Sequence, residues 1–402
     1  MKNGFKAVHY ERKTGSGLYP VKRFGPENAE KVREYHRSFP EYSETPLAEL
    51  KCLAEKLGLH GIYVKDESFR FGLNAFKVLG GSYAIGNILA ARLGVPLSEL
   101  TFEKLTGDET RKALGDITFV TATDGNHGRG VAWTANRLKQ KSVVYMPKGS
   151  AEERLNNIRA LGSDACITEL SYDDAVRLAN ENAKKFGWCV VQDTSWDGYE
   201  DVPAWIMEGY TTMALEAAEQ LRDVKPTHIF LQAGVGAMAG ALTGFFAEAW
   251  GDANRPVITI VEPNKADCIL RTAEADDGKL HFVTDEMDTI MAGLACGEPC
   301  AIGWSIMRDH ADNFVSMPDY VAAKGMRILG NPAGSDPKVI SGESGASTLG
   351  LVAELMQNDA LSDLRDQIGL NSDSVVLCFS TEGDTDKDNY RRIVWDGLYP
   401  SF

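Results

Sequence analysis

The stretch DESFRFGLNAFKVLGGS, residues 66–82, decides the fold, and the rest of the chain is organised around it. It follows a short apolar strand predicted over 61–65, and Lys77 stands among apolar neighbours where a helix is predicted to begin, with Asn74 as its N-cap. An apolar environment disfavours the charged form of an amine, so a lysine there is a nucleophile that can form a Schiff base with an aldehyde. The alternative is a surface lysine whose stem crosses an apolar patch, the commoner case for a lysine considered alone.

Apolar runs alternate with helical patterns downstream of this stretch. Strands are predicted over seven further runs: 117–121, 142–146, 166–167, 188–192, 228–232, 257–261 and 375–379. Continuous apolar strands separated by helices are typical of parallel sheets that are covered on both faces. The sequence therefore predicts an α/β protein.

The domain organisation is indicated by a break in strand spacing near residues 194–205 and not by a linker. The chain has no repeat and no stretch rich in proline or serine that would mark a boundary. We predict a large domain formed by residues 1–89 and 194–402, with a small domain formed by residues 90–193 inserted into it.

Charge and composition exclude several classes of protein. The chain of 402 residues has 57 acidic and 42 basic side chains and a net charge of −15, which argues against a nucleic-acid partner or an anionic membrane surface. No apolar run is long enough to span a membrane and the first residues lack a signal-like apolar core, so we expect a cytoplasmic protein. The seven cysteines form no CxxC pair, and no metal site is expected.

Two strand ends carry glycine and polar side chains. Residues 121–128 read TATDGNHG, and residues 232–240 read QAGVGAMAG; each precedes a predicted helix. Unpaired N–H groups and the helix dipole make such turns good anion sites, and glycine permits close approach of a ligand. For the first turn the alternative is a plain helix cap. The second turn alone is a weak signal for phosphate, because it lacks the lysine of a P-loop.

A third polar segment, FSTEGDTD at residues 379–386, follows the last predicted strand. Hydroxyls and carboxylates at the carboxyl end of a strand lie where open α/β sheets bind ligands. The alternative is a solvated turn. A lysine amine, a phosphate-binding turn and a polar group for a ring nitrogen are together what pyridoxal phosphate requires.

In this order, the elements resemble the fold-type II (tryptophan synthase β-like) pyridoxal phosphate enzymes, from about Glu41 to the C-terminus. The resemblance implies two open, twisted, mainly parallel sheets flanked by helices, as a large domain with a smaller inserted one. Within the family, the stretches at 74–77, 122–128, 232–238 and 380–386 are most similar to those of the diaminopropionate ammonia-lyases. Dehydratases of the family usually have serine where Asp124 stands.

The resemblance also implies a role for each motif. Lys77 would hold pyridoxal 5′-phosphate covalently, Asn126 would contact the ring hydroxyl, and Thr381 or Ser380 would contact the ring nitrogen. The N–H groups that would bind the phosphate belong to Gly234, Val235, Gly236, Ala237 and Met238. The implied reaction is an α,β-elimination that converts 2,3-diaminopropionate into pyruvate and two molecules of ammonia.

The residues expected to contact the substrate are Thr123, Asp124, His127 and Asp193. Asp124 is the informative one, since a carboxylate suits a substrate with a second amine and can act as a base opposite Lys77. Two bases on opposite faces would allow reaction of both the D and the L enantiomer. Asp193 is the further candidate for holding the amine.

Other interpretations stay open from the sequence. One is a serine/threonine dehydratase-like lyase, and another is a non-catalytic module that binds pyridoxal phosphate or a nucleotide. The partner is expected to be a small amino acid substrate, and family members are usually homodimers. Cys268 and Cys296 fall in an irregular region, 262–302, where a disulfide could brace a loop.

Overall fold

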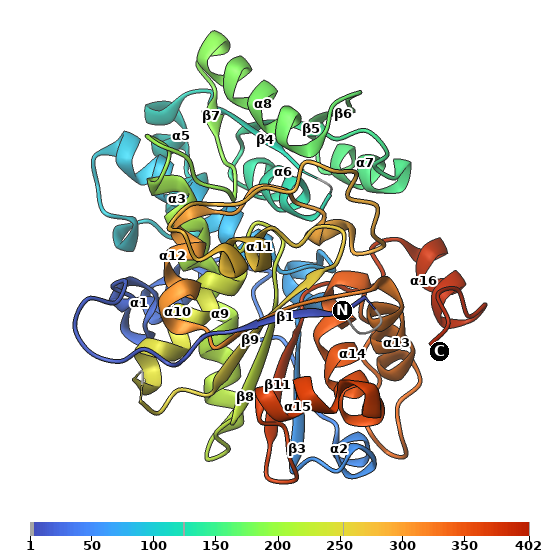
Figure 1. The fold of residues 1–402 in the computed structure, drawn as a ribbon. Helices are drawn as coiled ribbons and strands as arrows, with labels where there is room; N and C mark the ends of the chain where they lie inside the picture. The colour runs from blue at the N-terminus through green and yellow to red at the C-terminus, as the bar shows by residue number, and fades with distance from the viewer. Residues whose placement is uncertain (1–3, 124, 252, 402) are drawn as a thin grey trace.

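A computed structural model describes residues 4–123, 125–251 and 253–401, and it contains two sheets (Figure 1). The seven-stranded sheet has the order β1-β10-β9-β8-β11-β3-β2, and the four-stranded sheet has the order β6-β5-β4-β7. All pairings in both sheets are parallel except those of the two edge strands β1 and β2. The predicted α/β class with two mainly parallel sheets is therefore confirmed.

The strands of the large sheet are β1 (Lys6–His9), β2 (Leu47–Glu49), β3 (Gly61–Asp66), β8 (His228–Gln232), β9 (Val257–Pro263), β10 (Asn313–Met317) and β11 (Val375–Ser380). The strands of the small sheet are β4 (Thr118–Ala122), β5 (Lys141–Met146), β6 (Asp164–Ile167) and β7 (Cys189–Val190). Every strand that the sequence predicts is present, with ends that differ by a few residues. β1, β2 and β10 are additional.

The helices are α1 (Pro26–Arg37), α2 (Lys51–Leu57), α3 (Val78–Leu93), α4 (Phe102–Thr106), α5 (Asp108–Leu114), α6 (Asn126–Arg137), α7 (Glu152–Arg159), α8 (Tyr172–Phe186), α9 (Asp201–Leu221), α10 (Ala237–Trp250), α11 (Cys268–Ala275), α12 (Ala301–His310), α13 (Asp319–Gly330), α14 (Glu343–Gln357), α15 (Ser362–Ile368) and α16 (Lys387–Val394). A 3₁₀ segment, Glu67–Gly72, joins β3 to the Lys77 turn.

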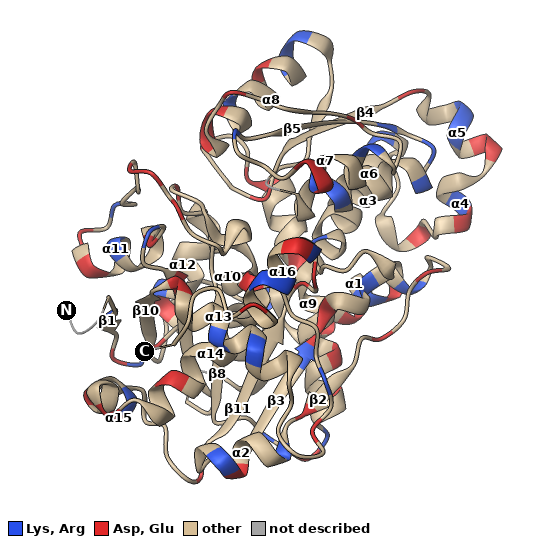
Figure 2. Cartoon of the chain, turned by 90° about the vertical axis from the view of Figure 1, so that its right-hand side faces the viewer, with Lys and Arg blue, Asp and Glu red and all other residues tan. Residues whose placement is uncertain are grey.

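Helices cover both faces of the large sheet because its central strands are apolar on both sides. In β11, Leu377 and Phe379 pack with α9 and α10, while Val376 and Cys378 pack with α13 and α14. β8 and β11 contain no Lys, Arg, Asp or Glu, and in Figure 2 the charged residues lie mainly on the outer helices and loops. No helix of the described part of the chain is long and apolar enough to cross a membrane.

The four-stranded sheet lies apart from the larger one, with α6, α7 and α8 around it (Figure 1). Its strands run from Thr118 to Val190, inside the range 90–193 that the sequence assigns to a small domain. The predicted start of that domain at residue 90 falls within α3. The domain boundaries stay a prediction.

The helix that carries the Lys77 turn begins later than expected. α3 starts at Val78 with Lys77 at its N-cap, and no side chain caps it. Asn74 has a φ of 57°, in the left-handed region that asparagine tolerates better than most residues. The expected Asn74 cap is therefore wrong; this residue forms the turn before the helix.

A fully buried ionic cluster supports the segment that leads into this turn. Lys65 and Arg70 both donate to Glu216 on α9, at 2.7 Å and 2.8 Å, and Arg70 also pairs with Glu67 at 2.8 Å. Burial alone raises the pKa of Glu216, but the two cations outweigh it and lower the pKa to about 2. The cluster ties β3, the 3₁₀ segment and α9 together.

Replacing Glu216 by alanine is expected to lower the free energy of unfolding by about 3–5 kcal/mol, because it leaves the buried Lys65 without a carboxylate and Arg70 with Glu67 alone. Urea unfolding followed by circular dichroism measures the change. The control is Glu27→Ala, which removes an exposed ion pair with Lys31 on α1 and should not move the midpoint measurably. Equal midpoints for the two variants would show that the cluster does not stabilise the fold.

Candidate functional site

Lys77 is held at the carboxyl end of β11 by backbone contacts. Phe76 donates its N–H to the carbonyl of Thr381 at 3.0 Å, and Gly383 donates to the carbonyl of Asn74 at 3.0 Å. These bonds lock the turn before α3 against the segment that follows β11, about 300 residues later in the chain. The lysine is thus fixed by main-chain geometry.

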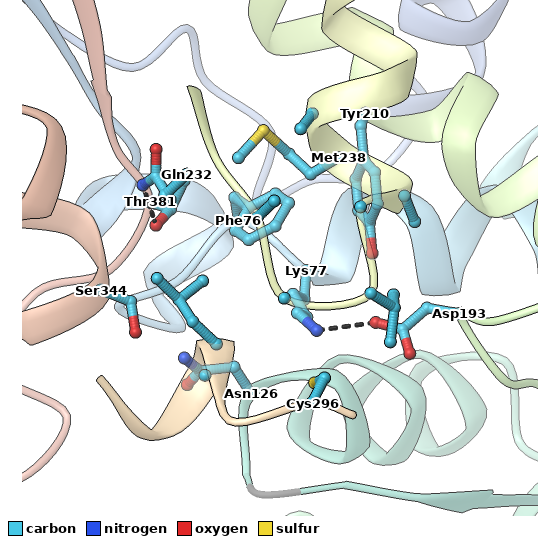
Figure 3. A pocket seen from close by; sticks show the side chains of 18 of the residues that line it. Phe76, Lys77, Asn126, Asp193, Tyr210, Gln232, Met238, Cys296, Ser344 and Thr381 are labelled. Carbon is cyan, nitrogen blue, oxygen red and sulfur yellow. Dashed lines mark hydrogen bonds and ion pairs between the residues drawn. The ribbon is translucent and has the colours of Figure 1, made fainter. Parts of the chain in front are cut away.

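The amine of Lys77 contacts a carboxylate. Its Nζ lies 2.6 Å from Asp193 Oδ2, and the two side chains are 18% and 3% exposed. The dashed line in Figure 3 marks this ion pair. Burial raises the pKa of Asp193, but the charges of Lys77 and His127 outweigh it and hold the pKa well below its usual range. The apolar setting expected for Lys77 holds for the residues beside it, whereas its amine is paired with a carboxylate. Its neighbours in sequence are buried, while its head reaches a cavity.

The glycine turn after β8 lines the same cavity, whose empty space, with the part open to solvent included, is about 570 Å³. Residues Gly234 to Met238 all belong to its wall, and α10 begins at Ala237. Gly236 has a φ of 88°, and a Cβ at Gly234 would come within 3.1 Å of the Gly293 carbonyl. The backbone conformation favours glycine at 236, and a side chain at 234 would crowd the opposite wall; the turn brings the N-terminus of α10 to the cavity.

The end of β11 contributes Thr381 to the cavity wall. Its Oγ1 accepts a hydrogen bond from Gln232 Nε2 at 2.9 Å. The preceding Ser380 donates its hydroxyl to Ser341 at 2.8 Å and is fully buried. Of the two hydroxyls that the sequence left as alternatives, the one of Thr381 lines the cavity.

A carboxylate stands between Asn126 and the start of α14. Asn126 donates its Nδ2 to Glu382 Oε2 at 2.6 Å, and the Ser344 N–H donates to Glu382 Oε1 at 3.3 Å. Glu382 is 2% exposed. Burial and the charge of Glu382 raise the pKa of the neighbouring Glu343 to about 7. Asn126, at the first turn of α6, is thereby joined to the large sheet.

A second cavity opens on the other side of Lys77. It is lined by Thr123 and His127 and by charged side chains of both signs, including Lys148 and Asp386. His127 bonds the carbonyl of Val191 through Nε2 at 2.8 Å. Lys77 belongs to the walls of both cavities, as do Tyr172, Gly293 and Cys296. The amine therefore stands where they meet.

Most of the residues predicted for the site thus gather around two adjoining cavities. Asp193 reaches the amine from the end of the β7 segment, and Thr123 accepts from the Gly125 N–H at 2.9 Å. Asp124 lies outside the described residues.

Cys268 and Cys296 are both thiols, without a disulfide between them. No cluster of metal-ligating side chains is found in the described ranges.

Sequence reasoning missed four polar residues of the cavity wall. Gln232 and Glu382 stand inside stretches that were singled out, but no role was assigned to them. Tyr172, which donates to Asp193 Oδ1 at 3.3 Å, and Ser344 have no motif around them. Gln232 had a usable signal, since a polar residue that ends an apolar strand before a glycine turn faces the ligand edge of the sheet.

Comparison with known proteins decides the family. A family model described as "Pyridoxal-phosphate dependent enzyme" matches residues 39–379, most of the chain. This chain belongs to the pyridoxal-phosphate dependent enzymes. It is 52% identical over 370 residues to a diaminopropionate ammonia-lyase of Salmonella typhimurium, with 91% of each chain covered. It is 51% identical to that of Escherichia coli K12, over 94% of this chain and 93% of the relative.

A solved structure has the same fold. The crystal structure of the Escherichia coli diaminopropionate ammonia lyase in complex with D-serine has a TM-score of 0.91 and 47% sequence identity, and 98% of each chain is covered. The expected fold-type II architecture of this pyridoxal-phosphate dependent enzyme is thereby confirmed.

The residues present fit pyridoxal phosphate. The cavity offers an amine at one end, the N-terminus of α10 with its glycine turn at another, and the Thr381 hydroxyl at a third, as Figure 3 shows for the labelled side chains. Ser344 Oγ is buried in the same wall and has no hydrogen-bond partner within the described ranges, as expected where a polar ligand completes the site.

Proposed function

We propose that this enzyme eliminates both amino groups of 2,3-diaminopropionate, giving pyruvate and two molecules of ammonia. The observation that carries the proposal is the Lys77–Asp193 pair, which stands between the cofactor cavity and the second cavity. A buried carboxylate at the reacting amine suits a substrate that brings a second cationic amine, which serine and threonine lack. The relatives at 51% and 52% identity are named for this activity.

Each element of the site has a task in this proposal. The N–H groups of residues 234–238 bind the phosphate, Thr381 contacts the ring nitrogen, and Asn126 contacts the ring hydroxyl. Lys77 holds the cofactor covalently and, once the substrate amine displaces it, takes the proton from Cα. When bound, the cofactor supplies the electron sink for that proton's removal.

On the substrate side, Asp193 holds the cationic amine beside Lys77, at the position where the lysine head now lies. Thr123 and His127 complete the wall of the second cavity, and Asp124 is the base proposed for the opposite face. With a base on each face, both enantiomers are substrates. Water then completes the reaction by releasing the second amino group as ammonia.

Turnover with three substrates tests the proposal. Diaminopropionate should give two molecules of ammonia for each pyruvate. Serine would give one molecule of ammonia for each pyruvate, and threonine would give no pyruvate. We expect kcat/KM to be highest for diaminopropionate by at least about tenfold, the effect of a single well-placed polar contact. A preference for serine or threonine would favour the dehydratase-like alternative, and no turnover with any of them would favour a binding module.

Replacing Gly236 by valine should weaken the affinity for pyridoxal phosphate by about tenfold or more, because the turn has positive φ and a Cβ there meets Met307 at 2.7 Å. Titration of the bound-cofactor absorbance measures the dissociation constant. Gly251→Val is the control, since Gly251 has a φ of 72° at the other end of α10 with open space around it. Equal affinities of the two variants would place the phosphate elsewhere.

We also propose that the enzyme is a homodimer. Large apolar side chains that remain exposed in the single chain support an interface, above all Trp395, which is 82% exposed. Light scattering should then give twice the mass of 43.9 kDa. A mass equal to one chain would contradict this. The cytoplasmic location stays a prediction.

A further inference from the structure

The side chain of Gln232 has one possible orientation. It ends β8, is 2% exposed, and places its Nε2 2.9 Å from the main-chain carbonyl of Phe379 and 2.9 Å from Thr381 Oγ1. A carbonyl oxygen can only accept a hydrogen bond, so the atom that faces it must be the NH₂ group of the amide. The neighbouring β11 backbone therefore determines which end of the amide Thr381 meets.

This orientation determines the direction of the Thr381 hydroxyl. Its oxygen accepts from Gln232, so its own proton is available for another partner. Within the described ranges no group of the protein accepts that proton, and Thr381 lines the cofactor cavity beside Gln232 (Figure 3). The hydroxyl proton thus points into the cavity.

We propose that Gln232 is a positioning residue that makes Thr381 a hydrogen-bond donor to the pyridine nitrogen and thereby keeps this nitrogen unprotonated. The inference rests on the proposed function, in which the ring nitrogen lies at Thr381. Two effects act together. A donor aimed at the nitrogen lone pair stabilises the neutral ring, and the adjacent NH₂ group of Gln232 places positive partial charge where a pyridinium would need negative charge.

The other titratable groups that line this cavity do not reverse the effect. They are Lys77, Tyr172, Asp193, Tyr210, Cys296 and Glu382. The Asp193 carboxylate is paired with Lys77, and the Glu382 carboxylate accepts from Asn126 and from the Ser344 N–H. Both acids are thus bound to other donors.

A neutral ring nitrogen withdraws electrons less strongly than a pyridinium. The carbanionic charge left at Cα is then less delocalised into the ring, so expulsion of the β-amino group competes well with reprotonation on the cofactor. Gln232 would in this way favour elimination over transamination, although it touches neither the substrate nor the reacting atoms.

The test is a double-mutant cycle on the holoenzyme, loaded with pyridoxal phosphate that carries ¹⁵N in its ring. The ¹⁵N chemical shift reports protonation of the nitrogen directly, and a pH titration gives its pKa. Gln232→Met removes the donor and keeps the length of the side chain, and the pKa should rise by about one pH unit or more. In a Thr381→Val background the same change should raise the pKa by clearly less, because the part that acts through the hydroxyl is gone and only the direct effect of the NH₂ group remains.

Gln232→Glu is the second variant, and it decides the matter if the methionine variant does not fold. An ionised carboxylate accepts the Thr381 proton and turns the hydroxyl away from the ring, so the nitrogen should become protonated at neutral pH. An unchanged ¹⁵N titration in the folded variant, or a nitrogen already protonated in the wild type, would overturn the inference. Turnover of diaminopropionate by the wild type is measured alongside, so that failure of the proposed function is seen separately.

Discussion

Lys77→Ala should lose turnover of 2,3-diaminopropionate by at least about 10²- to 10⁴-fold, the usual loss on removal of a general base, while the protein still binds pyridoxal phosphate. In the proposed site the phosphate would keep its contacts with the glycine turn, which do not depend on the amine. The visible absorption of a covalently held cofactor should disappear, and borohydride should no longer attach the label to the peptide that contains residue 77. Steady-state rates and mass spectrometry of the labelled peptide measure the two effects.

The matched control is Lys141→Ala, on β5, whose side chain is 66% exposed and pairs with Asp116, away from the residues that line the cavities. It should keep the wild-type rate, absorption and labelling. Turnover close to that of the wild type in the Lys77 variant would contradict the assignment of this lysine. A variant that has lost both the rate and the cofactor would mean that Lys77 provides most of the binding energy, contrary to the role proposed for the turn.

Asp124→Asn should abolish the reaction of the D enantiomer, with a loss of about two to four orders of magnitude, and should affect the L enantiomer less. The substitution keeps size and hydrogen bonding but removes the base. If Lys77 serves one face and Asp124 the other, only one enantiomer depends on the carboxylate for removal of its Cα proton. Separate kcat/KM values for D- and L-2,3-diaminopropionate, in wild type and variant, measure this.

Asp193→Asn is the comparison variant. Asp193 is proposed to hold the second amine of the substrate, and it is not assigned to the removal of the Cα proton from either face. Its loss should lower the rates of both enantiomers together, since both present a second cationic amine and both need the Lys77 partner. Equal losses on both enantiomers in the Asp124 variant would make that residue a binding group. No loss on either would leave it as a helix cap.

The parts of the fold that the sequence predicts are those with a local cause. Buried parallel strands such as β8 and β11 are continuous apolar runs, and glycine turns follow from steric limits on φ, so both are visible in a single stretch of chain. β10 was missed because Asn313 and Ser316 interrupt its apolar pattern, although every residue in it is buried. β1 was also missed, because it has only four residues and it pairs with β10, about 300 residues later in the chain.

The candidate site also has features with a local cause, which the sequence predicts, and features that depend on long-range contacts. The Lys77 turn and the glycine turn were found because each combines a reactive or anion-binding group with a recognisable neighbour. The Lys77–Asp193 contact was not, since it is made by elements 116 residues apart and only the tertiary fold brings them together. For the same reason the sequence did not indicate a role for Gln232, because its contact with Thr381 joins residues that are 149 positions apart.

The position of β11 in the large sheet also determines when this sheet can be completed during synthesis on the ribosome. β11 lies between β3 and β8, yet it comes after all the other described strands in the chain, about 300 residues after β3. β8 precedes β11 by about 145 residues, so at about 5–20 residues per second the emerging chain carries both β3 and β8 with open edges for roughly 7 to 30 seconds. Both edges are apolar and parallel-pairing, the kind of surface that captures other chains. Emergence of β11 is therefore the event that closes the sheet, and the residue directly after this strand, Thr381, completes the cavity wall.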